Sequence, residues 1–71
     1  MSERKRWMSD VPEKDNFGDP ITGVLIDGKT TMGPWALMTP DSHRMYGVGL
    51  GTGRGQRYER EEDGIYYKVD G

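Results

Sequence analysis

The chain has 71 residues, no cysteine and 32% hydrophobic residues, and its ten basic and twelve acidic side chains give a formal net charge of −2. This length allows one domain, and the absence of cysteine excludes a disulfide framework. The balanced charge excludes a strong field for nucleic acid or an anionic membrane, and no apolar run provides a membrane span or a signal segment. We therefore expect a soluble cytoplasmic protein, and homo-oligomerisation or a bound partner is a reasonable expectation for so small a core.

Residues 1–19 are predicted to form a mobile or loosely docked arm ahead of a small β-rich domain over residues 20–71. The segment mixes opposite charges with Pro12 and Gly18, and its few apolar side chains follow no period. Trp7 stands out, because a large aromatic side chain in a polar tail often anchors that tail to the body or to a partner. Docking and mobility both stay open at this point.

The first β-rich run, residues 21–26, is followed directly by Asp27-Gly28. Asp-Gly between two extended runs is a strong hairpin signal, so the sequence predicts a turn at these two residues. The partner strand is expected over residues 29–38. Gly33-Pro34 interrupts it, which indicates a bent strand or an edge strand.

The next segment predicts a short helix. Thr39 suits the N-cap, Pro40 the first helical position and Gly47 a left-handed stop. Because so short a helix is weak in isolation, we expect packing by Met45 and Tyr46 to hold it.

Every second residue from Gly47 to Gly55 is glycine. Side chains alternate between faces along a strand, so this segment, if extended, would carry its side chains on one face and bare backbone on the other. Glycine loses more conformational freedom on folding than any other residue, so a favourable contact of this segment must offset the entropic cost of its five glycines.

A second hairpin is predicted from residues 56–60 and 65–69, which flank the turn signature Glu61-Glu62-Asp63-Gly64. The second of these strands has a clear buried side, which is predicted to carry Ile65, Tyr67 and Val69. The whole pattern predicts a small β-dominated α+β domain, with two β-hairpins joined by a short helix and a glycine-rich strand or loop.

The glycines fit neither the dinucleotide fingerprint nor the P-loop spacing. Three interpretations remain: packing of the glycine segment beneath bulky aromatics such as Trp35 or Tyr67, contact with a phosphate or nucleotide, and a protein interface. Glycine amides form anion-binding nests, and arginine and tyrosine side chains suit phosphates and bases. The candidate ligand-binding residues are Gly51, Thr52, Gly53, Arg54, Gln56, Arg57 and Tyr58.

Methionine and tryptophan also suit adaptable binding surfaces. The candidate interface residues are Trp7, Met32, Trp35 and Tyr46. Asp41, Ser42 and His43 adjoin in sequence and do not face one another as a hydrolase triad requires, so no catalytic residue is assigned. Because the chain has one histidine and no cysteine, no metal site is expected, and no cofactor is expected either.

The run Met32-Gly33-Pro34-Trp35-Ala36-x-Met38, followed by Tyr46-Gly47-Val48-Gly49-Leu50-Gly51-Thr52-Gly53-Arg54-Gly55-Gln56-x-Tyr58, resembles a group of small proteins encoded by bacteriophages and prophages. The resemblance covers the stretch from Met32 to Tyr58. Some members of the group carry cysteine or histidine just after the position that matches Met38, in a form that suggests a metal knuckle. This chain has Thr39 and Ser42 there, so the resemblance does not extend to a metal site.

The resemblance implies a non-enzymatic accessory protein of the host cytoplasm, active in host takeover or against host defence. Two hypotheses follow. In the first, the protein sequesters an anionic nucleotide-like ligand, and the clustered arginine, tyrosine and glycine residues favour this hypothesis. In the second, it inhibits a host defence or regulatory protein through its tryptophan and methionine side chains and the acidic turn.

Overall fold

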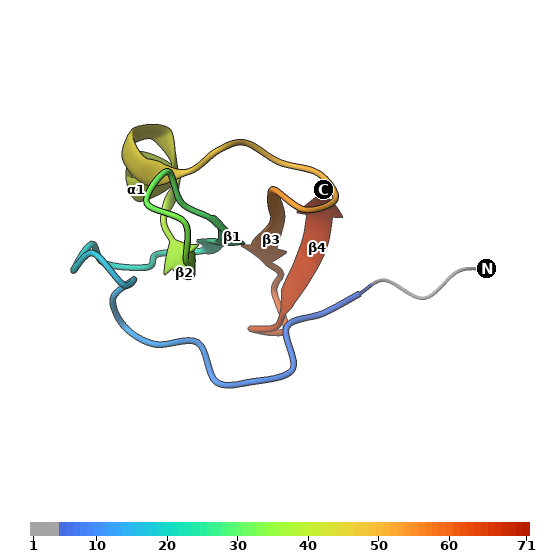
Figure 1. Ribbon diagram of the computed structural model, residues 1–71. Helices are drawn as coiled ribbons and strands as arrows, with labels where there is room; N and C mark the ends of the chain where they lie inside the picture. The colour runs from blue at the N-terminus through green and yellow to red at the C-terminus, as the bar shows by residue number, and fades with distance from the viewer. Residues whose placement is uncertain (1–4) are drawn as a thin grey trace.

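The computed structural model describes residues 5–71, which form a four-stranded antiparallel sheet and one short helix (Figure 1). The elements in chain order are β1 (Val24–Lys29), β2 (Trp35–Met38), α1 (Pro40–Tyr46), β3 (Gly55–Arg60) and β4 (Tyr66–Asp70). The strands lie in the order β2-β1-β3-β4 across the sheet. The small β-dominated α+β fold is therefore confirmed. The first four residues of the predicted arm lie outside the described residues.

The first hairpin forms, but its predicted turn is wrong. Asp27 and Gly28 lie inside β1, where they pair with β2, and the chain reverses further along, over residues 30–34. The backbone amide and the hydroxyl of Thr30 both donate to the carbonyl oxygen of Pro34, at 3.0 and 2.8 Å. An Asp-Gly pair is a local signal, and here Gly28 is used for close packing within the sheet instead of for a turn.

The second hairpin is confirmed, and its turn is closed by the amide of Glu61, which donates to the carbonyl oxygen of Ile65 at 2.9 Å. The predicted buried face of β4 is wrong. Tyr66 is 7% exposed, whereas Val69 is 45% exposed. Tyr66 lies opposite Arg60 of β3, on the face of the sheet that the N-terminal segment covers. That covering segment decides which side of β4 is buried.

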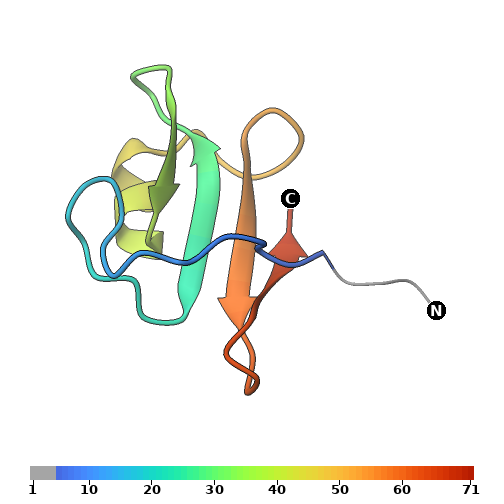
Figure 2. The same ribbon diagram turned by 90° about the horizontal axis from the view of Figure 1, so that it is seen from below.

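The N-terminal segment, residues 5–19, crosses one face of the sheet and bonds to both of its edges (Figure 2). On the outer edge of β4, the amide of Trp7 donates to the carbonyl oxygen of Tyr66 at 2.9 Å. On the outer edge of β2, the amide of Asn16 donates to the carbonyl oxygen of Leu37 at 3.1 Å, and the amide of Leu37 donates to Asn16 Oδ1 at 2.6 Å. We call this segment the arm. It occupies backbone groups that would otherwise be open at the sheet edges.

The sheet has buried side chains on both faces. On the arm side, the ring of Trp7 meets that of Tyr58 edge to face, with centroids 5.4 Å apart. On the other side, Ile26 and Met38 are almost fully buried, and α1 packs against β1 and β2. Figure 1 shows the helix and the arm on opposite sides of the sheet. The cluster on the arm side consists of Leu25, Tyr58 and Tyr66, with Trp7, Val11, Ile21 and Leu37 packed around it.

The predicted start of the helix is confirmed. Thr39 is the N-cap, its hydroxyl accepts a hydrogen bond from the amide of Ser42 at 3.2 Å, and Pro40 is the first helical residue. This hydroxyl satisfies one of the backbone donors that every helix start leaves unpaired.

The predicted end of the helix is wrong in its details. Gly47 has a φ of −80°, outside the left-handed region. Glycine is needed there for space, because a Cβ would lie 2.8 Å from the carbonyl oxygen of His43 and closer still to its ring. Met45 is 67% exposed and does not pack, whereas Tyr46 stacks on Phe17 of the arm at a centroid distance of 4.2 Å.

Candidate functional site

Residues 47–54, which we call the glycine loop, join α1 to β3 as an irregular segment. Gly49, Gly51 and Gly53 have φ angles of +117°, +119° and +77°, whereas no other residue type among the described residues has a positive φ. L side chains rarely adopt such angles, so glycine is required at each of these positions. The sequence left open a strand or a loop here, and the structure has a loop. At Gly49, Gly51 and Gly53 the period of two reflects a backbone that alternates in the sign of φ, whereas Gly47 and Gly55 have no positive φ.

The glycine loop packs against the backbone of the sheet. A Cβ on Gly28 of β1 would lie 2.9 Å from the carbonyl oxygen of Arg54, and a Cβ on Gly55 would lie 2.9 Å from that of Gly49. The amide of Lys29 also donates to the carbonyl oxygen of Arg54 at 2.8 Å. The loop therefore lies on the helix side of the sheet, held by contacts between main chains.

The packing interpretation of the glycines named the wrong partners. It expected the rings of Trp35 or Tyr67 above the loop. The atoms nearest to the Cβ positions of Gly47, Gly49 and Gly51 instead belong to His43 and Arg54, and nothing lies within 4 Å of that position at Gly53. His43 Nε2 lies 3.0 Å from the carbonyl oxygen of Gly49, which ties the loop to α1.

The loop ends in a tight turn that presents a cation. The amide of Arg54 donates to the carbonyl oxygen of Gly51 at 3.0 Å, and the amides and carbonyls of Gly51 and Gly55 exchange two hydrogen bonds. The guanidinium of Arg54 folds back over Gly51, with Nη2 3.1 Å from the point that a Cβ would occupy. Within the described residues, Arg54 has no ion pair, and the amides of Thr52 and Gly53 have no acceptor.

The seven candidate ligand residues divide between the two sides of the sheet. Arg57 follows Gly55 on the loop side, where its Nε lies 3.2 Å from Glu59 Oε2. Gln56 and Tyr58 lie on the arm side, where the buried Tyr58 hydroxyl donates to Gln56 Oε1 at 3.1 Å. Strand alternation separates them. Gly51, Thr52, Gly53 and Arg54 share one turn, and Arg57 lies on the same side of the sheet.

The four candidate interface residues also differ in their surroundings. Trp7 belongs to the core cluster, and Tyr46 stacks on Phe17. Met32 and Trp35 are 66% and 48% exposed, and both lie at the end of the first hairpin.

The three adjacent polar residues of α1 face different partners. Asp41 pairs with Arg44 at the surface, His43 contacts Gly49, and the hydroxyl of Ser42 bonds to Asp15. As the sequence predicted, their side chains do not converge on one another.

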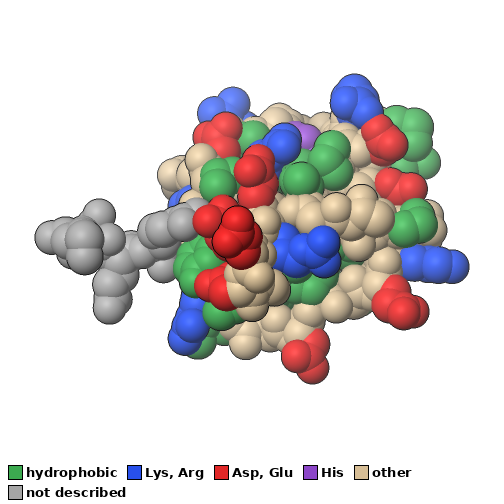
Figure 3. All heavy atoms as spheres, turned by 180° about the vertical axis from the view of Figure 1, so that it is seen from behind, with side chains coloured by type: hydrophobic (Ala, Val, Ile, Leu, Met, Phe, Trp, Pro, Cys, Tyr) green, Lys and Arg blue, Asp and Glu red, His purple; other side chains and the backbone are tan. Residues whose placement is uncertain are grey.

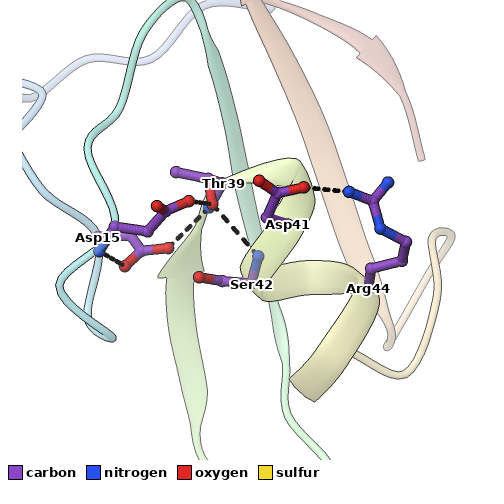
Figure 4. A network of polar contacts seen from close by, with 6 residues as sticks. Asp15, Thr39, Asp41, Ser42 and Arg44 are labelled. Carbon is purple, nitrogen blue, oxygen red and sulfur yellow. Dashed lines mark hydrogen bonds and ion pairs between the residues drawn. The ribbon is translucent and has the colours of Figure 1, made fainter.

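A polar cluster that the sequence did not predict joins the arm to the start of α1 (Figure 4). Asp15, only 7% exposed, accepts hydrogen bonds at Oδ1 from the amides of Phe17 and Asp19 and at Oδ2 from the amide of Thr39, each at 2.9 Å. The Asp-Asn-Phe-Gly-Asp composition signals a turn, but it gives no hint of the distant Thr39.

The electrostatics of this cluster favour a charged carboxylate. Burial alone raises the pKa of Asp15, but the hydrogen bonds from the Ser42 hydroxyl and from three backbone amides outweigh burial and hold the pKa below its ordinary value. Asp15 is thus an ionised residue with a structural role.

The surface carries charges of both signs. In Figure 3, basic, acidic and hydrophobic side chains are interspersed over the face that is seen from behind. A charged ligand that approaches this face therefore meets local groups of charges and not one field over the whole face.

Among residues 5–71, no group of three or more histidine, aspartate or glutamate side chains is placed to hold a metal ion. Within the same residues, no helix has the length and apolar character needed to cross a membrane. The chain matches no family model, no curated protein and no solved structure.

Proposed function

We propose that the chain is a non-enzymatic binding protein that captures an anionic, nucleotide-like small ligand at the glycine loop. The observation that carries the proposal is the turn at Gly51–Arg54. Among the described residues, the Arg54 guanidinium has no ion pair and the amides of Thr52 and Gly53 have no acceptor. Guanidinium groups and convergent backbone amides both suit phosphate oxygens. The proposed site consists of Gly51, Thr52, Gly53, Arg54 and Arg57.

The two arginines have unequal roles in this proposal. Arg54 has no partner among the described residues, so its donors are free for a ligand. Arg57 already contacts Glu59, at half-exposed positions where such a pair is weak. We assign Arg54 the main contact with the anion and Arg57 a supporting one.

The resemblance to phage-encoded proteins supplies the biological setting of the proposal. A small accessory protein of this kind would act in the cytoplasm of the bacterial host and remove a nucleotide signal of host defence. Gel filtration with and without small molecules from a host lysate tests capture and self-assembly together. A ligand bound between copies of the chain would increase the apparent mass.

The direct test is a binding titration with a panel of cyclic and linear nucleotides. We expect Arg54→Ala to weaken binding by tenfold or more, a loss typical of a charge-assisted contact, and Arg57→Ala to weaken it less, by about threefold. Arg44→Ala is the matched control, since Arg44 is an exposed arginine that pairs with Asp41.

Gln56→Ala is a second control, because Gln56 lies across the sheet from the turn. Both controls should bind as the unmodified protein does. If no nucleotide in the panel binds, or if Arg54→Ala binds normally, the proposal fails.

A second candidate function, inhibition of a host protein, is favoured by the exposure of Met32 and Trp35 at one end of the molecule. Exposed methionine and tryptophan side chains are common anchors of protein interfaces. Under this alternative, Trp35→Ala should abolish capture of a host protein in a pull-down, whereas Arg54→Ala should not. Recovery of the bait alone would contradict it.

A further inference from the structure

The arm side of the sheet has an uncovered half. In Figure 2 the arm crosses the middle of the sheet, and the part nearer to the Thr30–Pro34 turn is not crossed by the backbone. Register places Asp27 of β1 on this half, between Leu37 of β2 and Gln56 of β3. Trp35 follows on the same face of β2, because Leu37 belongs to the core cluster and side chains alternate.

Asp27 carries an unpaired carboxylate in this half. The ion pairs among the described residues join Arg44 to Asp41 and Arg57 to Glu59, and no hydrogen bond reaches the side chain of Asp27. The residue is only partly exposed. Burial raises the pKa of Asp27. No ion pair among the described residues joins Asp27 to Lys29, which lies on the same face opposite Trp35. A half-buried carboxylate without a partner is costly, and a positively charged donor would relieve that cost.

Gln56, Tyr58 and Lys29 carry donors on this face, but no hydrogen bond or ion pair among the described residues joins any of them to Asp27. Asp27 lies close enough to Tyr58 to raise the pKa of that hydroxyl, together with burial, which is the larger cause. The Tyr58 hydroxyl donates to Gln56 Oε1 and not to Asp27. Two carboxylate oxygens and the remaining lone pair of an amide oxygen are therefore left for an external N–H group.

The ring of Trp35 adds a planar apolar surface beside these acceptors. It is 48% exposed and lies diagonally across the strand pair from Asp27, a relation that separates Cβ atoms by about 7–8 Å. A guanidinium group can stack on such a ring while its N–H fork meets a carboxylate. An ammonium group can pair with the carboxylate, but it is not planar and has no fork of N–H donors, so it cannot stack on the ring and bind both carboxylate oxygens in the same way.

We propose that Asp27, Gln56 and Trp35 form a binding site for a guanidinium group. Asp27 accepts two of its N–H donors, Gln56 Oε1 accepts a third, and the indole of Trp35 covers its face. The site lies on the opposite side of the sheet from the glycine loop and does not depend on the function proposed for that loop.

The test is a titration of ¹⁵N-labelled protein with the peptide Gly-Arg-Gly, with Gly-Lys-Gly as the matched cation. We expect saturable shifts of the Asp27 and Gln56 amides and of the Trp35 indole signal, and a dissociation constant at least threefold weaker for the lysine peptide. Asp27→Asn should weaken arginine binding about tenfold or more, while its spectrum shows a retained fold.

Two further variants sharpen the result. Asp41→Asn removes an exposed carboxylate elsewhere and should bind as the unmodified protein does, and Arg54→Ala should also leave guanidinium binding intact. Equal binding by Asp27→Asn, equal binding of the lysine peptide, or shifts confined to the acidic turn at residues 61–63 would overturn the proposal.

A parallel titration with free methylguanidine distinguishes the source of the ligand. Binding as tight as that of the peptide indicates a small guanidino compound. Tighter binding of the peptide indicates an arginine side chain of a partner protein. Either result supports the site.

Discussion

The arm and the glycine loop are both irregular segments, and they cover opposite sides of the same sheet in different ways. The arm docks through side chains: Trp7 joins the core cluster, and the carboxylate of Asp15 is buried against the start of α1. The glycine loop docks through its main chain, so close to Gly28 and Gly55 that no Cβ fits between.

This difference shows that a segment can be held on a sheet in two ways. Its side chains can pack into the core, or the absence of side chains can let its main chain approach closely. A docked side chain can be removed, with the loss of its contacts. A close approach of two main chains is disrupted when a side chain is added to a glycine, because even one methyl group forces the two backbones apart. The following variants test that distinction from the largest expected effect to the smallest.

Trp7→Ala should have the largest effect, a loss of about 3 kcal/mol in the free energy of unfolding, because it removes a ring from the core cluster. Denaturant unfolding measures the loss. Hydrogen exchange should show reduced protection of the Lys68 amide, which donates to the carbonyl oxygen of Lys5 in the arm at 2.8 Å. The amide of Leu37 at the other edge should stay protected, because it keeps its hydrogen bond to Asn16.

Two controls show how much of this loss is due to the ring of Trp7. Met8→Ala changes a neighbouring arm residue that is 79% exposed and should have little effect. Trp7→Phe should cost only about 1 kcal/mol, because it keeps a ring and removes a buried indole N–H that has no acceptor among the described residues. A Trp7→Ala protein as stable as the original would show that the arm does not contribute to the core.

Gly28→Ala should cost about 1–3 kcal/mol, since its Cβ would lie 2.9 Å from the Arg54 carbonyl oxygen and 3.2 Å from the Cα of Gly55. Thermal unfolding measures the change. Gly53 provides the contrast, because its surroundings are open but its φ is +77°.

Gly53→Ala should therefore cost about 1 kcal/mol from backbone strain alone, and Gly53→Asn less, because asparagine tolerates positive φ. Equal losses for both substitutions at Gly53, or no loss at Gly28, would contradict the distinction between conformation and space.

Of the three main substitutions, Trp7→Ala, Gly28→Ala and Asp15→Asn, the last should have the smallest effect, about 1–2 kcal/mol at neutral pH. An amide group would replace one of the two acceptor oxygens of the buried Asp15 carboxylate. The folded-state pKa of Asp15 lies below its ordinary value of 3.8, so the ionised carboxylate stabilises the fold above that value. This stabilisation is lost as the pH falls through the folded-state pKa.

The difference between the variant and the original protein should therefore narrow in acid, and unfolding curves at several pH values measure it. Asp41→Asn is the matched control, since Asp41 is exposed and should show little change at any pH. A constant difference across the acid range would indicate that the charge of Asp15 is not what stabilises the helix start.

The parts of the fold that were predicted correctly depend on neighbours in the chain. Thr39 and Pro40 begin a helix because a cap and its amide are three residues apart, and the second hairpin follows from its own turn residues. Two of the errors involve distant partners. Gly28 is a glycine because Arg54 approaches it, and Tyr66 instead of Tyr67 is buried because the arm lies on that side.

The candidate site shows the same limit. The turn that holds Gly51, Thr52, Gly53 and Arg54 is a local unit, and the sequence grouped these residues correctly as neighbours. Sequence proximity also grouped Gln56 with Arg57, but strand alternation places them on opposite sides. Asp27 drew attention only as a turn residue, because its unpaired carboxylate is apparent only when β2 and β3 lie on either side of it.

The sequence by itself determined the class of fold, the start of the helix, the second hairpin and the need for glycine along the loop, because propensities, caps and turns act over a few residues. The tertiary structure alone decided which faces are buried, why individual glycines are required and which polar groups meet. Those outcomes depend on contacts between segments that are far apart in the chain, and a local pattern carries no information about which segment will cover it.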